Sequence, residues 1–132
     1  MLNRNELIEL VEKRYFNVMD QGRLDDTLAC LAPDCVWHIY PAGTVLKGRD
    51  GEIRDAFANA MARYETMWHS NFEWTVDEAA QRVAASFDVR LVDNAGKETE
   101  LSNVKLFQVE DGHFVRLDLY FSTTEAIVSD PN

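Results

Sequence analysis

The sequence predicts one α+β domain, in which three N-terminal helices pack on a strongly curved, mainly antiparallel β-sheet. Hydrophobic residues recur at spacings of three and four in the first half of the chain, and they alternate with polar residues in the second half. Helices followed by consecutive strands are typical of α+β architecture, and a curved sheet that wraps helices would form a cone with an apolar interior. The 132 residues contain no repeat or linker, so we expect a single domain over residues 1–132.

Three segments of the first half have helical patterns. The first covers residues 4–20 and begins with a capping box at Asn3 and Glu6. Its apolar stripe is made of Leu7, Ile8, Val11, Tyr15, Val18 and Met19. A second, short helix is expected over residues 24–31 and a third over residues 51–66, each with apolar residues on one face.

Strand patterns cover most of the remaining chain. A β-type run at residues 35–40 lies between the second and third helices, and a loop is expected to follow it as far as Gly48. Four strands are expected after the third helix, at residues 69–76, 81–92, 98–109 and 113–122. The segments DNAG and EDG between the last three are turn signals, so these strands should form an antiparallel meander.

The composition excludes several classes of protein. The chain is 46% hydrophobic, which argues against disorder, and its formal net charge of −10 would repel the phosphates of nucleic acid. No apolar run approaches the ~18 residues that a membrane span needs, so we expect no membrane association. The first residues lack an apolar signal-peptide core, so we expect a cytoplasmic protein with free thiols at Cys30 and Cys35.

Several short motifs follow one another in a characteristic order over residues 4–122. Tyr15 is followed by Gly22, and the segments LAPD, PAG, KGRD and FQVEDG occur later in the chain. With these motifs the chain resembles the nuclear transport factor 2-like superfamily, and within it the SnoaL-like and ketosteroid isomerase branch. The resemblance implies a conical α+β fold, a pocket between the concave sheet and the helices, and a homodimer. It does not specify a reaction, because this fold hosts isomerases, cyclases, hydrolases and non-catalytic modules.

The resemblance is incomplete where ketosteroid isomerases carry their chemistry. Those enzymes use a tyrosine on the first helix, an aspartate just before a Pro-x-Gly segment and a protonated aspartate on a later strand. Tyr15 matches the tyrosine, but Tyr40 and Lys105 stand at the two aspartate positions. We therefore expect that this protein does not abstract a steroid proton by that mechanism.

Strand alternation gives the expected lining of the pocket. His38 and Tyr40 are expected to face inward, although a bulge or register shift would instead turn Trp37 and Ile39 inward. The expected substrate-binding residues are Phe57, Met61, Trp68, Phe87, Asn103, Lys105, Phe107, Leu117 and Leu119.

The expected catalytic residues are Tyr15, His38, Tyr40 and His69. A buried tyrosine hydroxyl can donate to a developing oxyanion, and histidine can move a proton near neutral pH. Each residue also has a structural alternative: a core tyrosine with one partner, or a half-buried or rim histidine. An inward Lys105 would be costly unless it is paired or deprotonated, so an outward Lys105 in a salt bridge is the simpler alternative.

These residues favour a cofactor-independent acid–base enzyme of the isomerase, cyclase or dehydratase type. Its substrate would be a small apolar carbonyl or hydroxylated ring compound. No side-chain spacing predicts a metal site and no glycine-rich loop predicts a phosphate site, so we expect neither a metal nor a cofactor. The alternative is a non-catalytic module for small-molecule binding or dimerisation, which the missing carboxylates favour.

A homodimer through the outer face of the sheet is expected. Val104 and Leu106 are apolar, although they alternate with Lys105 and Phe107 on the opposite face of the same strand. A strand that is apolar on both faces needs a partner on each, and no helix is left to cover the outer one.

Overall fold

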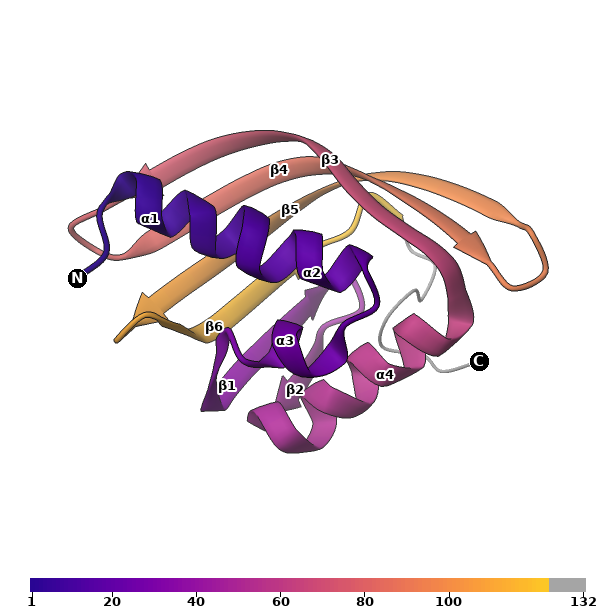
Figure 1. Cartoon of the computed structure of the whole chain (residues 1–132), viewed down its shortest axis with the longest axis horizontal. Helices are drawn as coiled ribbons and strands as arrows, with labels where there is room; N and C mark the ends of the chain where they lie inside the picture. The colour runs from indigo at the N-terminus through magenta and orange to yellow at the C-terminus, as the bar shows by residue number, and fades with distance from the viewer. Residues whose placement is uncertain (124–132) are drawn as a thin grey trace.

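A computed structural model describes residues 1–123 and has the expected α+β architecture, with helices on the concave side of a curved, unclosed sheet (Figure 1). The first helix consists of three consecutive segments, α1 (Arg4–Glu9), η1 (Leu10–Phe16) and α2 (Asn17–Asp20). It is followed by α3 (Leu24–Leu28) and later by η2 (Gly48–Ile53) and α4 (Arg54–Arg63). Within this part of the chain, each helix is too short or too polar to cross a membrane.

The sheet contains six strands within residues 1–123: β1 (Leu31–Tyr40), β2 (Thr44–Lys47), β3 (Tyr64–Asp77), β4 (Arg82–Asp93), β5 (Glu98–Glu110) and β6 (His113–Tyr120). Their order is β2-β1-β6-β5-β4-β3, and only the pair β1–β6 is parallel. The meander from β3 to β6 confirms the expected connection of the later strands. The short strand β2 was expected to be loop, but it forms a hairpin with β1, where Val45 pairs with His38.

The first helix winds differently from the expected α-helix. The backbone N–H of Asn17 donates to the carbonyl of Glu12, five residues back, which is a π-type turn. This turn holds an extra residue, so the buried stripe rotates around the axis. Phe16 consequently enters the core beside Tyr15, whereas Val18 is only half-buried. The three-and-four spacing of the sequence could not predict this change of stripe.

The third helix ends at Arg63 rather than at residue 66, because the backbone becomes extended at Tyr64. Strand β3 therefore begins five residues earlier than expected. Partway along the strand, the side chains that face the core change from odd-numbered to even-numbered positions. Met67 and His69 face the interior, whereas Phe72 packs on the core from an even position. The pairing with β4 is interrupted between Ser70 and Glu73, which indicates a bulge that reverses the alternation.

The orientation of the first strand differs from the expected one. Trp37 and Ile39 are buried in the core, and His38 and Tyr40 lie half-buried on the outer face of the sheet. The inward orientation expected for His38 and Tyr40 is therefore wrong, and the alternative register is the one observed. Trp37 and Ile39 form the more apolar set, so this register removes more apolar surface from water and leaves the imidazole and phenol near solvent.

Candidate active site

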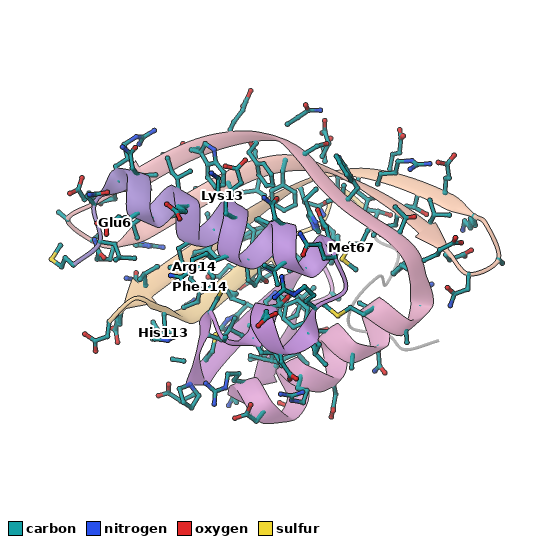
Figure 2. The ribbon with its side chains drawn as sticks, viewed as in Figure 1. Glu6, Lys13, Arg14, Met67, His113 and Phe114 are labelled. Carbon is teal, nitrogen blue, oxygen red and sulfur yellow. The ribbon has the colours of Figure 1, made fainter. Side chains whose placement is uncertain are left out.

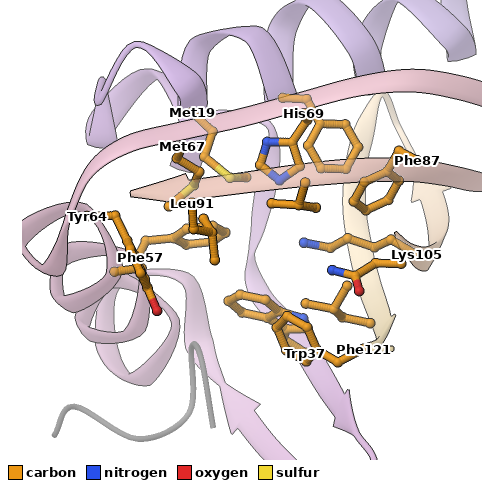
Figure 3. Close-up of a pocket in the computed structure, with 15 residues that line it drawn as sticks. Met19, Trp37, Phe57, Tyr64, Met67, His69, Phe87, Leu91, Lys105 and Phe121 are labelled. Atoms are coloured by element: carbon orange, nitrogen blue, oxygen red, sulfur yellow. The ribbon is translucent and has the colours of Figure 1, made fainter. Parts of the chain in front are cut away.

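A cavity of about 50 Å³ lies between the helices and the concave face of the sheet (Figure 3). Its walls come from the first helix, α4 and five of the strands, β1, β3, β4, β5 and β6. The lining residues are Phe16, Met19, Trp37, Phe57, Ala60, Tyr64, Met67, His69, Phe87, Val89, Leu91, Asn103, Lys105, Leu119 and Phe121.

Asp20, the last residue of α2, holds His69 at the cavity wall. His69 Nδ1 lies 2.5 Å from Asp20 Oδ1, and the backbone N–H of His69 donates to Asp20 Oδ2 at 2.9 Å. The two side chains are only 8% and 13% exposed, and Phe16 packs against the imidazole with 4.6 Å between ring centroids. A carboxylate at Nδ1 favours the tautomer with the proton on Nδ1, which leaves a lone pair on Nε2. The arrangement can therefore accept a proton from a ligand.

Lys105 faces the cavity from β5, so the outward orientation considered above is not observed. The residue is 3% exposed, and its Nζ donates a hydrogen bond to the hydroxyl of Tyr15. Nζ also lies 4.4 Å from the ring centroid of Trp37 and 4.7 Å from that of Tyr15. Alternation along β5 requires this direction, because Asn103 and Phe107 on the same face are buried as well.

The ammonium of Lys105 has no anionic partner within residues 1–123, where none of the ion pairs includes it. Burial removes water from the ammonium and lowers the pKa of Lys105 to about 7. Burial also raises the pKa of Tyr15 well above its ordinary value, so the hydroxyl bonded to Lys105 stays protonated.

Two further side chains that carry N–H groups, Asn103 and Trp37, line the cavity. Asn103 Oδ1 accepts a hydrogen bond from the backbone N–H of Ser122 at 3.1 Å, so its amide nitrogen is the atom that can donate to a ligand. The indole Nε1 of Trp37 is buried and has no hydrogen-bond partner within the described residues. Phe57 stacks on this indole with 4.8 Å between ring centroids, which fixes its plane.

The structure brings together only part of the expected site. The expected residues that line the cavity are Phe57, His69, Phe87, Asn103, Lys105 and Leu119. Tyr15, Phe107 and Leu117 are fully buried behind this lining, and Met61 packs against the core outside it.

Three expected residues lie on the outer face of the sheet instead. Trp68 is 59% exposed, because Met67 and His69 on either side of it point inward. Nδ1 of His38 lies 3.7 Å from Oδ1 of Asp118 on the neighbouring strand, and the ring of Tyr40 stacks on that of Tyr120. The expected placement of these three side chains in the pocket is therefore wrong.

Asp20 and the donor role of Trp37 were missed in the sequence. Asp20 did carry a signal, because an acidic residue at the C-terminal end of a helix opposes the helix dipole. Residues that break such a local rule are often found at functional sites. The sequence indicates Trp37 only as an alternative inward residue, and no motif points to a role for its indole nitrogen.

Comparison with known proteins places this geometry in a family. The sequence profile of the SnoaL-like domain family matches residues 13–117. A search of curated proteins with the whole sequence found no match. Among solved structures, the chain is similar to a candidate polyketide cyclase from Xanthomonas campestris pv. campestris, with 24% identity and a TM-score of 0.82 over 97% of this chain and 98% of the other.

Two other solved structures have the same fold with lower identity. A candidate isomerase from Bacillus subtilis is 16% identical, with a TM-score of 0.80 over 92% of this chain and 90% of the other. An LEH-like epoxide hydrolase from M. tuberculosis is 18% identical, with a TM-score of 0.76 over 89% of this chain and 84% of the other. At these identities the similarity establishes the fold alone.

Proposed function

This chain belongs to the SnoaL-like domain family, and we propose that its cavity is the active site of a cofactor-independent acid–base enzyme. The substrate is a small apolar carbonyl or hydroxylated ring compound, and the reaction is of the isomerase, cyclase or dehydratase type. The observation that carries the proposal is the His69–Asp20 pair at the wall of a cavity lined mostly by hydrophobic side chains. The names of the similar structures, which include a candidate cyclase and a candidate isomerase, support an enzymatic role.

His69 is the general base in this proposal. Its Nε2 removes a proton from the carbon next to the ligand's carbonyl group and later returns it to another position. Asp20 keeps the proton of the neutral ring on Nδ1 and stabilises the imidazolium that forms during the reaction. A positioned base of this kind contributes about 10²- to 10⁴-fold to a rate.

Asn103 and Trp37 stabilise the ligand oxygen in this proposal. Removal of the α-proton places negative charge on that oxygen, and the amide nitrogen of Asn103 and the indole N–H of Trp37 are donors for it. The surrounding hydrophobic side chains exclude water, which strengthens both interactions. Tyr15 acts only through its hydrogen bond with Lys105, and His38 and Tyr40 have no part in the mechanism.

The proposal is tested by exchange of α-protons in heavy water. The protein is mixed with acetone, cyclopentanone or cyclohexanone, and loss of the α-proton signal is followed by NMR. We expect the wild type to accelerate exchange of at least one ketone, and His69→Gln to lower that acceleration about 100-fold or more. The matched control is His113→Gln, because His113 is exposed in the β5–β6 hairpin, well away from Met67 at the cavity (Figure 2).

Two results would contradict the enzymatic role. If α-proton exchange is equally fast in wild type and His69→Gln, His69 is not the general base. A ketone that shifts the NMR signals of cavity residues without any accelerated exchange would favour the alternative, a small-molecule-binding module.

The outer face of the sheet is proposed as the interface of a homodimer. Val104 and Tyr120 lie opposite each other on neighbouring strands and are 40% and 43% exposed. Val45 on β2 adds a further exposed apolar side chain to the same face. Large exposed apolar patches on a sheet are typical of protein–protein contacts.

We further propose that the protein works in a reducing compartment such as the cytoplasm. Cys30 and Cys35 are free and buried, as expected for thiols that are not needed as a cross-link.

A further inference from the structure

We propose that Lys105 binds carbonyl compounds covalently: its Nζ condenses with a small apolar aldehyde or ketone in the cavity to form an iminium ion. This inference rests on the proposed function only in that the same cavity receives a carbonyl compound. Figure 3 shows the side chain of Lys105 extending into the cavity, between Trp37 on one side and His69 on the other. This role requires a lysine amine that the ligand can reach and that is uncharged before the reaction. The surrounding side chains must also stabilise the positive charge that the reaction forms.

The groups around Lys105 allow its amine to be uncharged. The titratable side chains that face it are Tyr15 from η1, Cys35 from β1 and His69 from β3. Burial raises the pKa of Tyr15 well above its usual value and that of Cys35 to about 12, so neither is an anion at neutral pH. Asp20, which lies behind His69 at the cavity wall, is already engaged by that residue. No described group therefore holds Lys105 as an ammonium.

The aromatic surroundings also suit the cation that the reaction forms. Nζ lies within 6 Å of five ring centroids, those of Tyr15, Phe16, Trp37, Phe57 and Phe107. An iminium ion spreads its charge over carbon and nitrogen, so it needs less hydration than an ammonium, and ring faces stabilise it through cation–π contacts. An apolar cavity of this kind is a known way to activate a lysine amine.

The condensation needs neither an oxidant nor a reductant. The lone pair of Nζ attacks the carbonyl carbon, a C–N bond forms, and one amine proton passes to the oxygen to give a carbinolamine. A second proton, taken from the solvent, lets that oxygen leave as water, and the iminium ion remains. The iminium makes the neighbouring C–H more acidic, so a base on the same cavity wall can remove the ligand's α-proton more easily. Hydrolysis by one water molecule reverses the steps and restores Lys105.

The inference predicts a strong selectivity among the four lysines of the chain. Lys13, Lys47 and Lys97 are exposed. An ordinary exposed lysine is uncharged in only about one molecule in 2,500 at neutral pH. Lys105, with its pKa lowered to about 7, is uncharged in about half of the molecules. The uncharged amine is thus roughly 10³-fold more abundant at Lys105, and this advantage should outweigh its lower intrinsic nucleophilicity.

The experiment is reductive trapping with propanal, a small apolar aldehyde. Wild-type protein at neutral pH receives limiting propanal and sodium cyanoborohydride, which reduces an iminium to a stable propylamine. Peptide mass spectrometry then measures the modified fraction at each amine, with the amino group of Met1 as an internal reference. We expect Lys105 to be modified at least 10-fold faster than Lys13, Lys47 or Lys97, and urea-unfolded protein to lose this preference. Equal modification of all four lysines in the folded protein, or none at Lys105, would overturn the inference.

Two variants separate this inference from the proposed function. His69→Gln should still be trapped at Lys105, because the amine does not depend on the base for its reduced adduct. Trapping at Lys105 in a wild type that does not accelerate α-proton exchange would support the covalent site and contradict the enzyme. Exchange without trapping at Lys105 would support His69 and overturn the covalent site. Lys97→Met, which removes an exposed lysine, is the matched control and should change neither result.

Discussion

Replacing Lys105 by methionine should stabilise the protein in a strongly pH-dependent way. Burial lowers the pKa of Lys105 from 10.5 to about 7 in the folded state. Between these two values the unfolded chain binds a proton that the folded chain does not, so wild-type stability rises with pH across this window. At about 1.4 kcal/mol for each unit of pKa, the buried amine costs the folded state about 5 kcal/mol below pH 7 and about 2 kcal/mol near pH 9.

Methionine removes this cost but also removes the hydrogen bond to Tyr15, at a loss of about 1–3 kcal/mol. Lys105→Met should therefore be more stable than the wild type by about 3 kcal/mol near pH 6, and about equal to it near pH 9. Urea unfolding followed by tryptophan fluorescence, at one protein concentration and at both pH values, measures the difference. A difference between Lys105→Met and wild type that is the same at both pH values would refute the reasoning, and exposed Lys97→Met should show no such trend.

Three further substitutions and one thiol-labelling experiment test separate features of the protein. Asp20→Asn should slow α-proton exchange about 10- to 100-fold with little change in ketone affinity, measured by NMR titration, because the imidazolium loses its carboxylate. Trp37→Phe keeps the stacking on Phe57 but removes the indole N–H, so ketone affinity should fall about 5- to 10-fold in the same titration. Burial raises the pKa of Cys35 to about 12, so at pH 8 its thiol should react with a thiol reagent only after urea is added. Val104→Asp should convert the dimer to monomers by light scattering, and a monomeric wild type would contradict the proposed interface.

The helices and the meander could be predicted because their signals are local. Turn residues and strict alternation place Asn103 and Lys105 on one face of β5, and that face is the buried one. Alternation alone did not decide whether Lys105 points inward or outward, because burying a lysine ammonium costs free energy. Its orientation follows from the rest of the strand, whose apolar neighbours on the same face must be covered.

The features that position the site depend on irregular backbone that periodicity does not show. The π-type turn in the first helix brings Phe16 into the core, and the bulge after His69 reverses the alternation along β3. The register of β1 depends on its pairing with β6, which is irregular between Leu31 and Val36. The contact of Asp20 with His69 joins residues 49 positions apart, so no local pattern could reveal it.

A crystal structure of the protein with a bound cyclic ketone tests the central claim most directly, namely that His69 acts as a base on a carbonyl compound in the cavity. The account predicts that the ligand's α-carbon lies about 3–3.5 Å from Nε2 of His69, the distance needed for proton transfer. The ligand's oxygen should face the N–H groups of Asn103 and Trp37, or its carbonyl carbon should be bonded to Nζ of Lys105. A ketone bound instead on the outer face of the sheet, beside His38 and Tyr40, would contradict the account.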